Sequence, residues 1–63
     1  MPTIPYEVQL REVRREIAMR RRVYAGQVEN RRMTQAEADH KIAVMEAVAE
    51  TLVPLAKAEE RPL

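Results

Sequence analysis

Apolar residues in the first half of the chain recur at the spacing of a helix. At about 100° per residue, they fall within a stripe about 60° wide on a helical wheel. The stripe consists of Tyr6, Leu10, Val13, Ile17, Tyr24 and Val28. Proline is tolerated in a first helical turn, so we expect this helix to begin near Pro5 and to cover about residues 5–30. A stripe this narrow is typical of a helix that packs along one seam.

The second half carries a wider apolar face, and it predicts a second helix over about residues 35–59. A narrow seam can be drawn through Ile42, Met45, Ala49, Leu52 and Ala56. Val44, Val48, Val53 and Leu55 widen this seam to about half of the helix circumference. Pro54 predicts either a kink in this helix or an end at Val53 followed by a restart.

The residues between these two segments combine a helix stop with a helix start. Asn30 tolerates the left-handed conformation that commonly ends a helix, and we expect it to close the first one. Thr34 and Glu37 form a capping box, in which the Thr34 hydroxyl accepts from the Glu37 N–H and the Glu37 carboxylate accepts from the Thr34 N–H. The turn is therefore expected at residues 31–34. The pattern predicts an all-α fold, an antiparallel two-helix hairpin that forms a single domain over residues 1–63.

One partner helix cannot cover an apolar face as broad as that of the second segment. With 63 residues and no cysteine, the chain has neither a large core nor a disulfide to stabilise it. We therefore expect a homodimer in which two hairpins pack into a four-helix bundle. The predicted dimer interface consists of Val44, Met45, Val48, Leu52 and Leu55.

The formal net charge is only +1, but the charges are unevenly distributed. Residues 1–33 hold eight arginines and four glutamates, a balance of +4, whereas residues 34–63 hold three basic and six acidic residues, a balance of −3. Oppositely charged antiparallel helices favour ion pairs beside their shared seam, although each exposed pair adds little energy. Arg20 lies at the edge of the apolar stripe, where it could extend past the seam or pair with an acid of the second helix.

The first helix presents two further groups of residues as a candidate partner-binding surface. One flank carries Arg11, Arg14, Arg15, Arg21 and Arg22, and the back carries Val8, Met19 and Val23. Scattered surface residues of this kind need no function. Arginine also binds carboxylates and phosphates, so the flank fits an acidic protein surface or a nucleic-acid backbone. Interleaved glutamates and the lack of aromatic residues between the arginines count against nucleic acid.

The sequence contains no catalytic or metal-binding pattern. His40 is the single histidine, there is no cysteine, and Glu46 and Glu50 form only an ordinary helical pair. We therefore expect neither an enzyme nor a cofactor, a metal or a small-molecule substrate. The first residues do not resemble a signal peptide, and no apolar run approaches the length of about 20 residues that spans a bilayer. We expect a cytoplasmic protein without a membrane partner.

The central half of the chain resembles a group of short bacteriophage and prophage proteins of uncharacterised function. Their pattern runs Arg-Arg-x-Val-Tyr-Pro, a valine, Gly-Arg-Met-Thr, an alanine and Ile-Ala-x-Met-Glu-Ala. The matching positions, within about residues 20 to 49, are Arg21-Arg22-Val23-Tyr24, Val28, Arg32-Met33-Thr34, Ala38, Ile42 and Met45-Glu46-Ala47. Two positions depart from the pattern: Ala25 replaces Tyr-Pro, and Arg31 replaces the glycine of the turn.

The resemblance implies a phage origin and a helical hairpin in the cytoplasm of the host cell, without naming an activity or site residues. Small phage proteins often bind and inhibit or redirect a host protein such as a regulator, a motor or a defence component. We therefore expect a phage-encoded interaction protein, with a nucleic-acid-binding helical bundle as the alternative.

Overall fold

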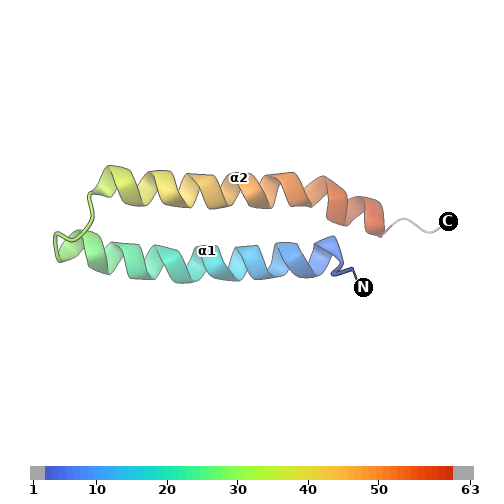
Figure 1. Ribbon diagram of the computed structural model, residues 1–63, viewed down its shortest axis with the longest axis horizontal. Helices are drawn as coiled ribbons and strands as arrows, with labels where there is room; N and C mark the ends of the chain where they lie inside the picture. The colour runs from blue at the N-terminus through green and yellow to red at the C-terminus, as the bar shows by residue number, and fades with distance from the viewer. Residues whose placement is uncertain (1–2, 61–63) are drawn as a thin grey trace.

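The computed structural model describes residues 3–60 and folds them into two antiparallel helices (Figure 1). Helix α1 spans Tyr6–Glu29 and helix α2 spans Gln35–Glu59. Both lie side by side over their whole length, and the molecule measures 52 × 19 × 17 Å. The predicted all-α hairpin is thus confirmed. No helix in the described part of the chain has the length and apolarity that a membrane crossing requires.

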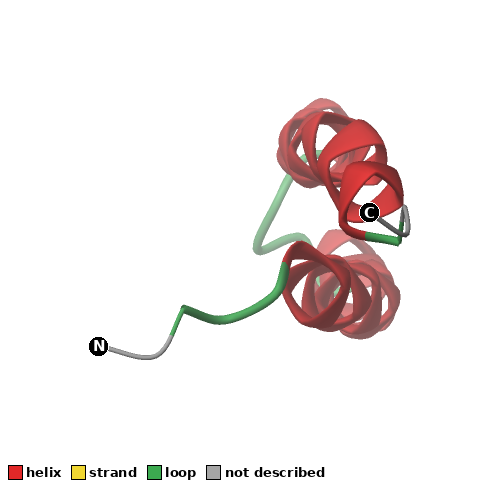
Figure 2. Ribbon diagram, turned by 90° about the vertical axis from the view of Figure 1, so that its right-hand side faces the viewer, coloured by secondary structure: helices red, strands yellow, loops and turns green. Residues whose placement is uncertain are grey.

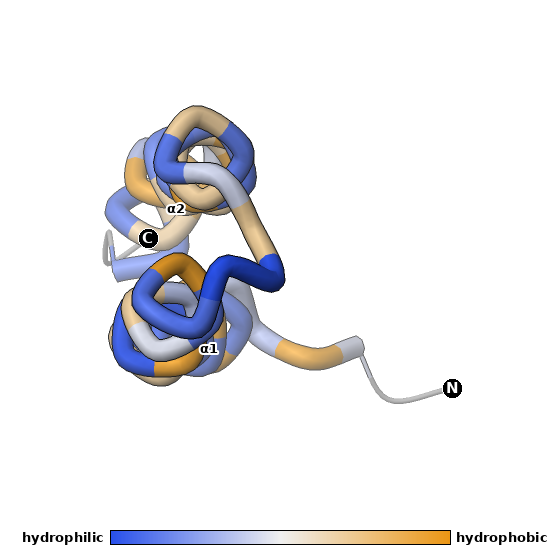
Figure 3. The backbone as a smooth tube through the Cα atoms, turned by 90° about the vertical axis from the view of Figure 1, so that its left-hand side faces the viewer, coloured by the Kyte–Doolittle hydropathy of each residue, from blue (hydrophilic) through white to orange (hydrophobic). Residues whose placement is uncertain are grey.

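The two helices bury a narrow seam. Leu10 and Ile17 of α1 and Ala38 and Ala56 of α2 are the buried apolar residues of the described chain. Most other residues of the two predicted stripes are half-buried, as the partial cover of a single neighbouring helix requires. Seen from the end of the hairpin, hydrophobic segments occur on both helices and polar segments cover most of α1 (Figure 3).

Helix α1 ends in a Schellman motif, but the left-handed residue is not the predicted one. Asn30 has φ −84°, so the prediction that it adopts the left-handed conformation was wrong. Arg31 takes that position with φ 59°. The Arg31 N–H donates to the Val28 carbonyl at 3.1 Å and the Arg32 N–H donates to the Gln27 carbonyl at 2.8 Å. Two otherwise unpaired carbonyls of the last turn are satisfied in this way.

Thr34 caps the start of helix α2, as the sequence predicts. The Glu37 N–H donates to Thr34 Oγ1 at 3.1 Å. The Glu37 carboxylate differs from the expected geometry, because it accepts from the Thr34 hydroxyl at 3.3 Å and not from a backbone N–H. The helix continues through Pro54, with its last turns bending toward α1 in Figure 1. Pro54 is exposed on the side away from the seam, which leaves Ala56 free to pack.

The start of α1 is capped by the end of α2, a contact that the sequence did not indicate. Pro5 is the N-cap residue of α1 and supplies no side-chain hydrogen bond. Glu59 fills this role from the other helix: its carboxylate accepts from the Tyr6 N–H at 2.8 Å and from the Glu7 N–H at 3.1 Å. Its negative charge also lies at the positive end of the α1 dipole. The open end of the hairpin is therefore closed by a bidentate cap, while residues 3–5 extend away from both helices (Figure 2).

Arg31→Gly should stabilise the hairpin by about 1 kcal/mol, because glycine adopts positive φ without the steric cost that a side chain incurs. At fixed protein concentration this corresponds to a rise in thermal midpoint of about 4–8 °C, measured by circular dichroism. Arg32→Gly is the matched control, since it removes the same charge without a positive φ to relieve. An Arg31→Gly protein no more stable than the Arg32→Gly protein would contradict this account of the turn.

Glu59→Gln should destabilise the hairpin by about 1 kcal/mol, the typical value of a helix N-cap. The substitution removes the charge and one of the two acceptor oxygens at the start of α1. Glu60→Gln is the control, because it removes the neighbouring charge at the same end of α2 without touching the cap. Urea denaturation of both variants measures the difference, and equal midpoints would show that the cap contributes nothing.

Candidate functional site

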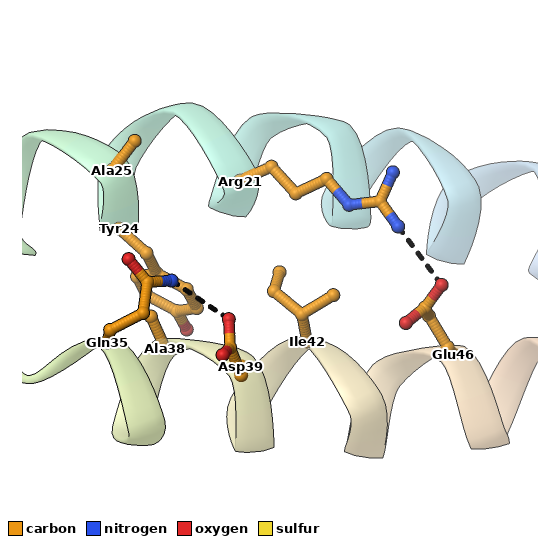
Figure 4. A pocket seen from close by; sticks show the side chains of 8 residues that line it. All are labelled: Arg21, Tyr24, Ala25, Gln35, Ala38, Asp39, Ile42 and Glu46. Carbon is orange, nitrogen blue, oxygen red and sulfur yellow. Dashed lines mark hydrogen bonds and ion pairs between the residues drawn. The ribbon is translucent and has the colours of Figure 1, made fainter.

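Two open grooves of about 310 and 360 Å³ run along one side of the seam. Figure 4 shows the first, with Ile42 between the two helices. Arg21 donates to Glu46 across the seam at 3.0 Å, and the Gln35 amide donates to Asp39 at 2.9 Å. Each end of this groove therefore holds one pair of polar side chains that are hydrogen-bonded to each other. Arg21 and Glu46 link the two helices, whereas Gln35 and Asp39 pair within α2, so none of these four groups is left free for a ligand.

The predicted ion pairs beside the seam are fewer than the charge distribution suggests. Arg21–Glu46 is the single cross-helix ion pair of residues 3–60. Arg20 forms no ion pair with α2: it pairs with Glu16 of its own helix at 2.8 Å. The hydrogen bond from Arg20 to Glu16 raises the pKa of the Arg20 guanidinium above its ordinary value.

The five arginines of the predicted partner-binding surface separate into two groups. Arg14 and Arg21 line the second groove, with Glu46 and Glu50 opposite them on α2. Arg11, Arg15 and Arg22 lie on the side of α1 that points away from α2. Arg11 also contacts Glu7 at 3.7 Å, whereas Arg15 and Arg22 form no ion pair within the described chain.

The three apolar residues of the same prediction are all exposed. Val8 is 43% exposed, Met19 is 44% and Val23 is 48%. Helical spacing places Val8 and Met19 between Arg15 and the acidic Glu12, and it places Val23 at the edge of this surface. We call this surface the outer face of α1 and define it by Val8, Arg11, Glu12, Arg15, Met19, Arg22, Val23 and Gly26.

Gly26 lies on the outer face of α1, and no feature of the fold requires a glycine at this position. A Cβ atom at this position would meet nothing within 4 Å, and no glycine of the described chain has a positive φ. Helix α1 continues through it to Glu29, although glycine inside a helix costs about 0.5–1 kcal/mol relative to alanine. The fold therefore does not explain the presence of glycine here.

The predicted dimer interface lies on α2 and is only partly covered by α1. Val44, Val48 and Leu55 are exposed, whereas Met45 and Leu52 are half-buried against the seam. His40 is exposed and lies beside Lys41 and Val44. Within residues 3–60, no three His, Asp or Glu side chains gather as metal ligands would.

Comparisons with known protein families, with curated proteins and with solved structures found no match to this chain. The candidate binding sites of this protein are therefore sought on the surfaces of the hairpin itself. Two of them remain after the seam is formed: the mixed basic and apolar outer face of α1, and the apolar side of α2.

Gly26→Ala should stabilise the protein by about 0.5–1 kcal/mol, because alanine removes conformational freedom from the unfolded chain and meets no neighbour in the folded one. Chemical denaturation with circular dichroism detection measures the change. A lower stability would mean that the position is sterically restricted in the folded protein, and Gly26 would then have a structural role after all.

Proposed function

We propose that the protein is a phage-encoded interaction protein that binds a host protein through the outer face of α1 and inhibits or redirects it. The observation that carries the proposal is the combination of Met19 and Val23, both exposed, with Arg15 and Arg22, which form no ion pair in the described chain. A helix recognised along one side presents side chains at i, i+4 and i+7, and Arg15, Met19 and Arg22 have this spacing. The phage origin rests on the sequence resemblance.

The chemistry of the outer face indicates what kind of host surface it fits. Its apolar residues would enter a hydrophobic depression, and its arginines would meet acidic side chains around that depression. Charge complementarity of this type speeds association and excludes basic partners. Gly26, which is half-buried, supports the proposal, because a residue without a side chain on the outer face of α1 allows a partner backbone to approach closely.

Nucleic acid is the second candidate partner, and it is supported by Arg15 and Arg22 on their own. Phosphates would bind these arginines, but the interleaved Glu12 and the apolar Met19 and Val23 would gain nothing from a phosphate backbone. A host protein uses both components of the surface. For this reason the protein partner is our conclusion.

Affinity capture from host lysate tests the proposal with four forms of the protein. The wild-type chain should retain one host protein in a stoichiometric amount after nuclease treatment. Met19→Glu and Arg22→Glu should each reduce this amount at least tenfold, because they place a carboxylate on the contact surface. Arg32→Glu is the control, since it makes the same charge reversal in the turn and should leave the capture unchanged.

Two outcomes would count against the proposal. Recovery of nucleic acid, with affinity falling steeply between about 50 and 200 mM salt, would support the second candidate. Equal capture by the wild-type, Met19→Glu and Arg22→Glu forms would show that the partner binds elsewhere on the hairpin. Gly26→Leu adds an independent probe: a Cβ atom at this position meets nothing within 4 Å in the folded chain, so a loss of binding by a variant shown to be folded would place the partner against Gly26.

A further inference from the structure

A second apolar stripe runs along α2 beside the buried seam. Val44 is 49% exposed, Val48 is 41% and Leu55 is 38%. The intervals between these residues, with Thr51 included, are four, three and four, so all four side chains lie on one side of the helix. Half-buried Met45 and Leu52 lie between the stripe and the seam, which makes the apolar surface continuous.

We propose that this stripe is covered by the same stripe of a second copy, with the two α2 helices antiparallel about a two-fold axis. Val44 then packs against Leu55 of the partner subunit, and Val48 packs against Thr51 of the partner subunit. The inference is independent of the proposed function, because the outer face of α1 plays no part in it.

The exposed area of the chain supports a second copy as the occupant. A folded monomer of 7.3 kDa is expected to expose about 4,200 Å². This chain exposes 5420 Å², an excess of about 1,200 Å². A standard interface buries about 800 Å² on each partner, so one dimer contact removes most of the excess.

The spacing of the stripe makes it self-complementary, as a two-fold contact requires. Val44 and Leu55 are equally distant from the midpoint of the stripe, and so are Val48 and Thr51. In the antiparallel register, Val44 and Leu55 therefore lie opposite each other, and Val48 lies opposite Thr51. Arg20 of α1 lines a groove with Val44 and Met45 of α2 and is paired with Glu16, so it supplies the kind of polar rim expected around an apolar contact.

The charges at the two ends of the stripe select the antiparallel orientation. Lys41 lies one turn before Val44, and Glu59 and Glu60 follow Leu55 at the negative end of the α2 dipole. The antiparallel register brings Lys41 of each copy to the acidic last turn of the other. A parallel register would instead place Lys41 against Lys41 of the partner subunit, and like charges in contact are destabilising.

Disulfide trapping tests the register directly, because the chain contains no cysteine. An equimolar mixture of Val44→Cys and Leu55→Cys proteins should form the mixed disulfide dimer under mild oxidation. Val44→Cys alone should not form a disulfide-linked dimer. In the antiparallel register, 11 residues of helix separate the two equivalent cysteines by about 16 Å, which is far beyond the reach of a disulfide. Self-dimers of Val44→Cys, or an absence of mixed dimers, would overturn the proposed arrangement.

Sedimentation equilibrium measures the association itself. The wild-type chain should have twice the mass of the 7.3 kDa monomer at micromolar concentration. Val48→Glu should weaken the dimer at least tenfold, whereas Val8→Glu, which alters an equally exposed valine on α1, should leave it intact. Leu52 is the poorer site for this test, because it is half-buried against the seam of the hairpin itself. A wild-type chain that remains monomeric would overturn the proposal even if Val48→Glu fails to fold.

Discussion

A hairpin of two helices can bury side chains along a single seam, and this constraint governs the rest of the structure. Each helix hides only the stripe that faces the other, so the buried apolar set of the described chain consists of two large residues and two alanines. In larger domains a third element covers what the first two expose. Here the remaining apolar side chains stay on the surface. The two ends of the hairpin are stabilised by hydrogen bonds to backbone groups.

The two ends are held in different ways. At the turn, the Schellman motif and the Thr34 cap satisfy backbone groups locally, with residues close to each other in sequence. At the open end, Glu59 binds the start of α1 from more than fifty residues away. This contact also sets the relative position of the helices along their axes, because a shift of one helix turn, about 5.4 Å, would remove it. Pro54 lies inside α2, and the last turns of this helix bend toward α1 (Figure 1), where Glu59 makes its contact.

Features that depend on neighbouring residues could be predicted from the sequence, and features that depend on two distant segments could not. The helical periodicity gave both helices, and Thr34 with Glu37 marked the start of α2 correctly. The turn prediction assigned the left-handed conformation to Asn30 by residue preference. The hydrogen-bonding pattern of the Schellman motif required it one residue later, at Arg31. One signal for that position was present in the sequence comparison: the phage pattern that the chain resembles has glycine where this chain has Arg31, and glycine is the usual left-handed residue after a helix.

The candidate surfaces show the same division. Helical spacing alone places Val8 and Met19 on the back of α1 and Arg15 on the flank beside them, because these positions are related by local geometry. Spacing does not reveal that Arg21 is bound by Glu46, or that Arg20 prefers Glu16 to any acid of α2, since these pairings depend on the lateral register of two helices. The cap by Glu59 had one usable signal, which is that Pro5 has no side-chain oxygen for the N–H groups that follow it.

The two surfaces that remain are compatible because they point in different directions. If α2 of one copy lies against α2 of another, the α1 helices occupy the outside of the bundle and their outer faces stay accessible. Each dimer then presents two equal binding surfaces, and a multimeric host protein could engage both at once. Binding at two linked sites raises the apparent affinity without any new contact, provided that the spacing of the sites matches. On these two proposals, the narrow seam would have a functional consequence, because the apolar surface that it leaves exposed would lead to a bivalent assembly.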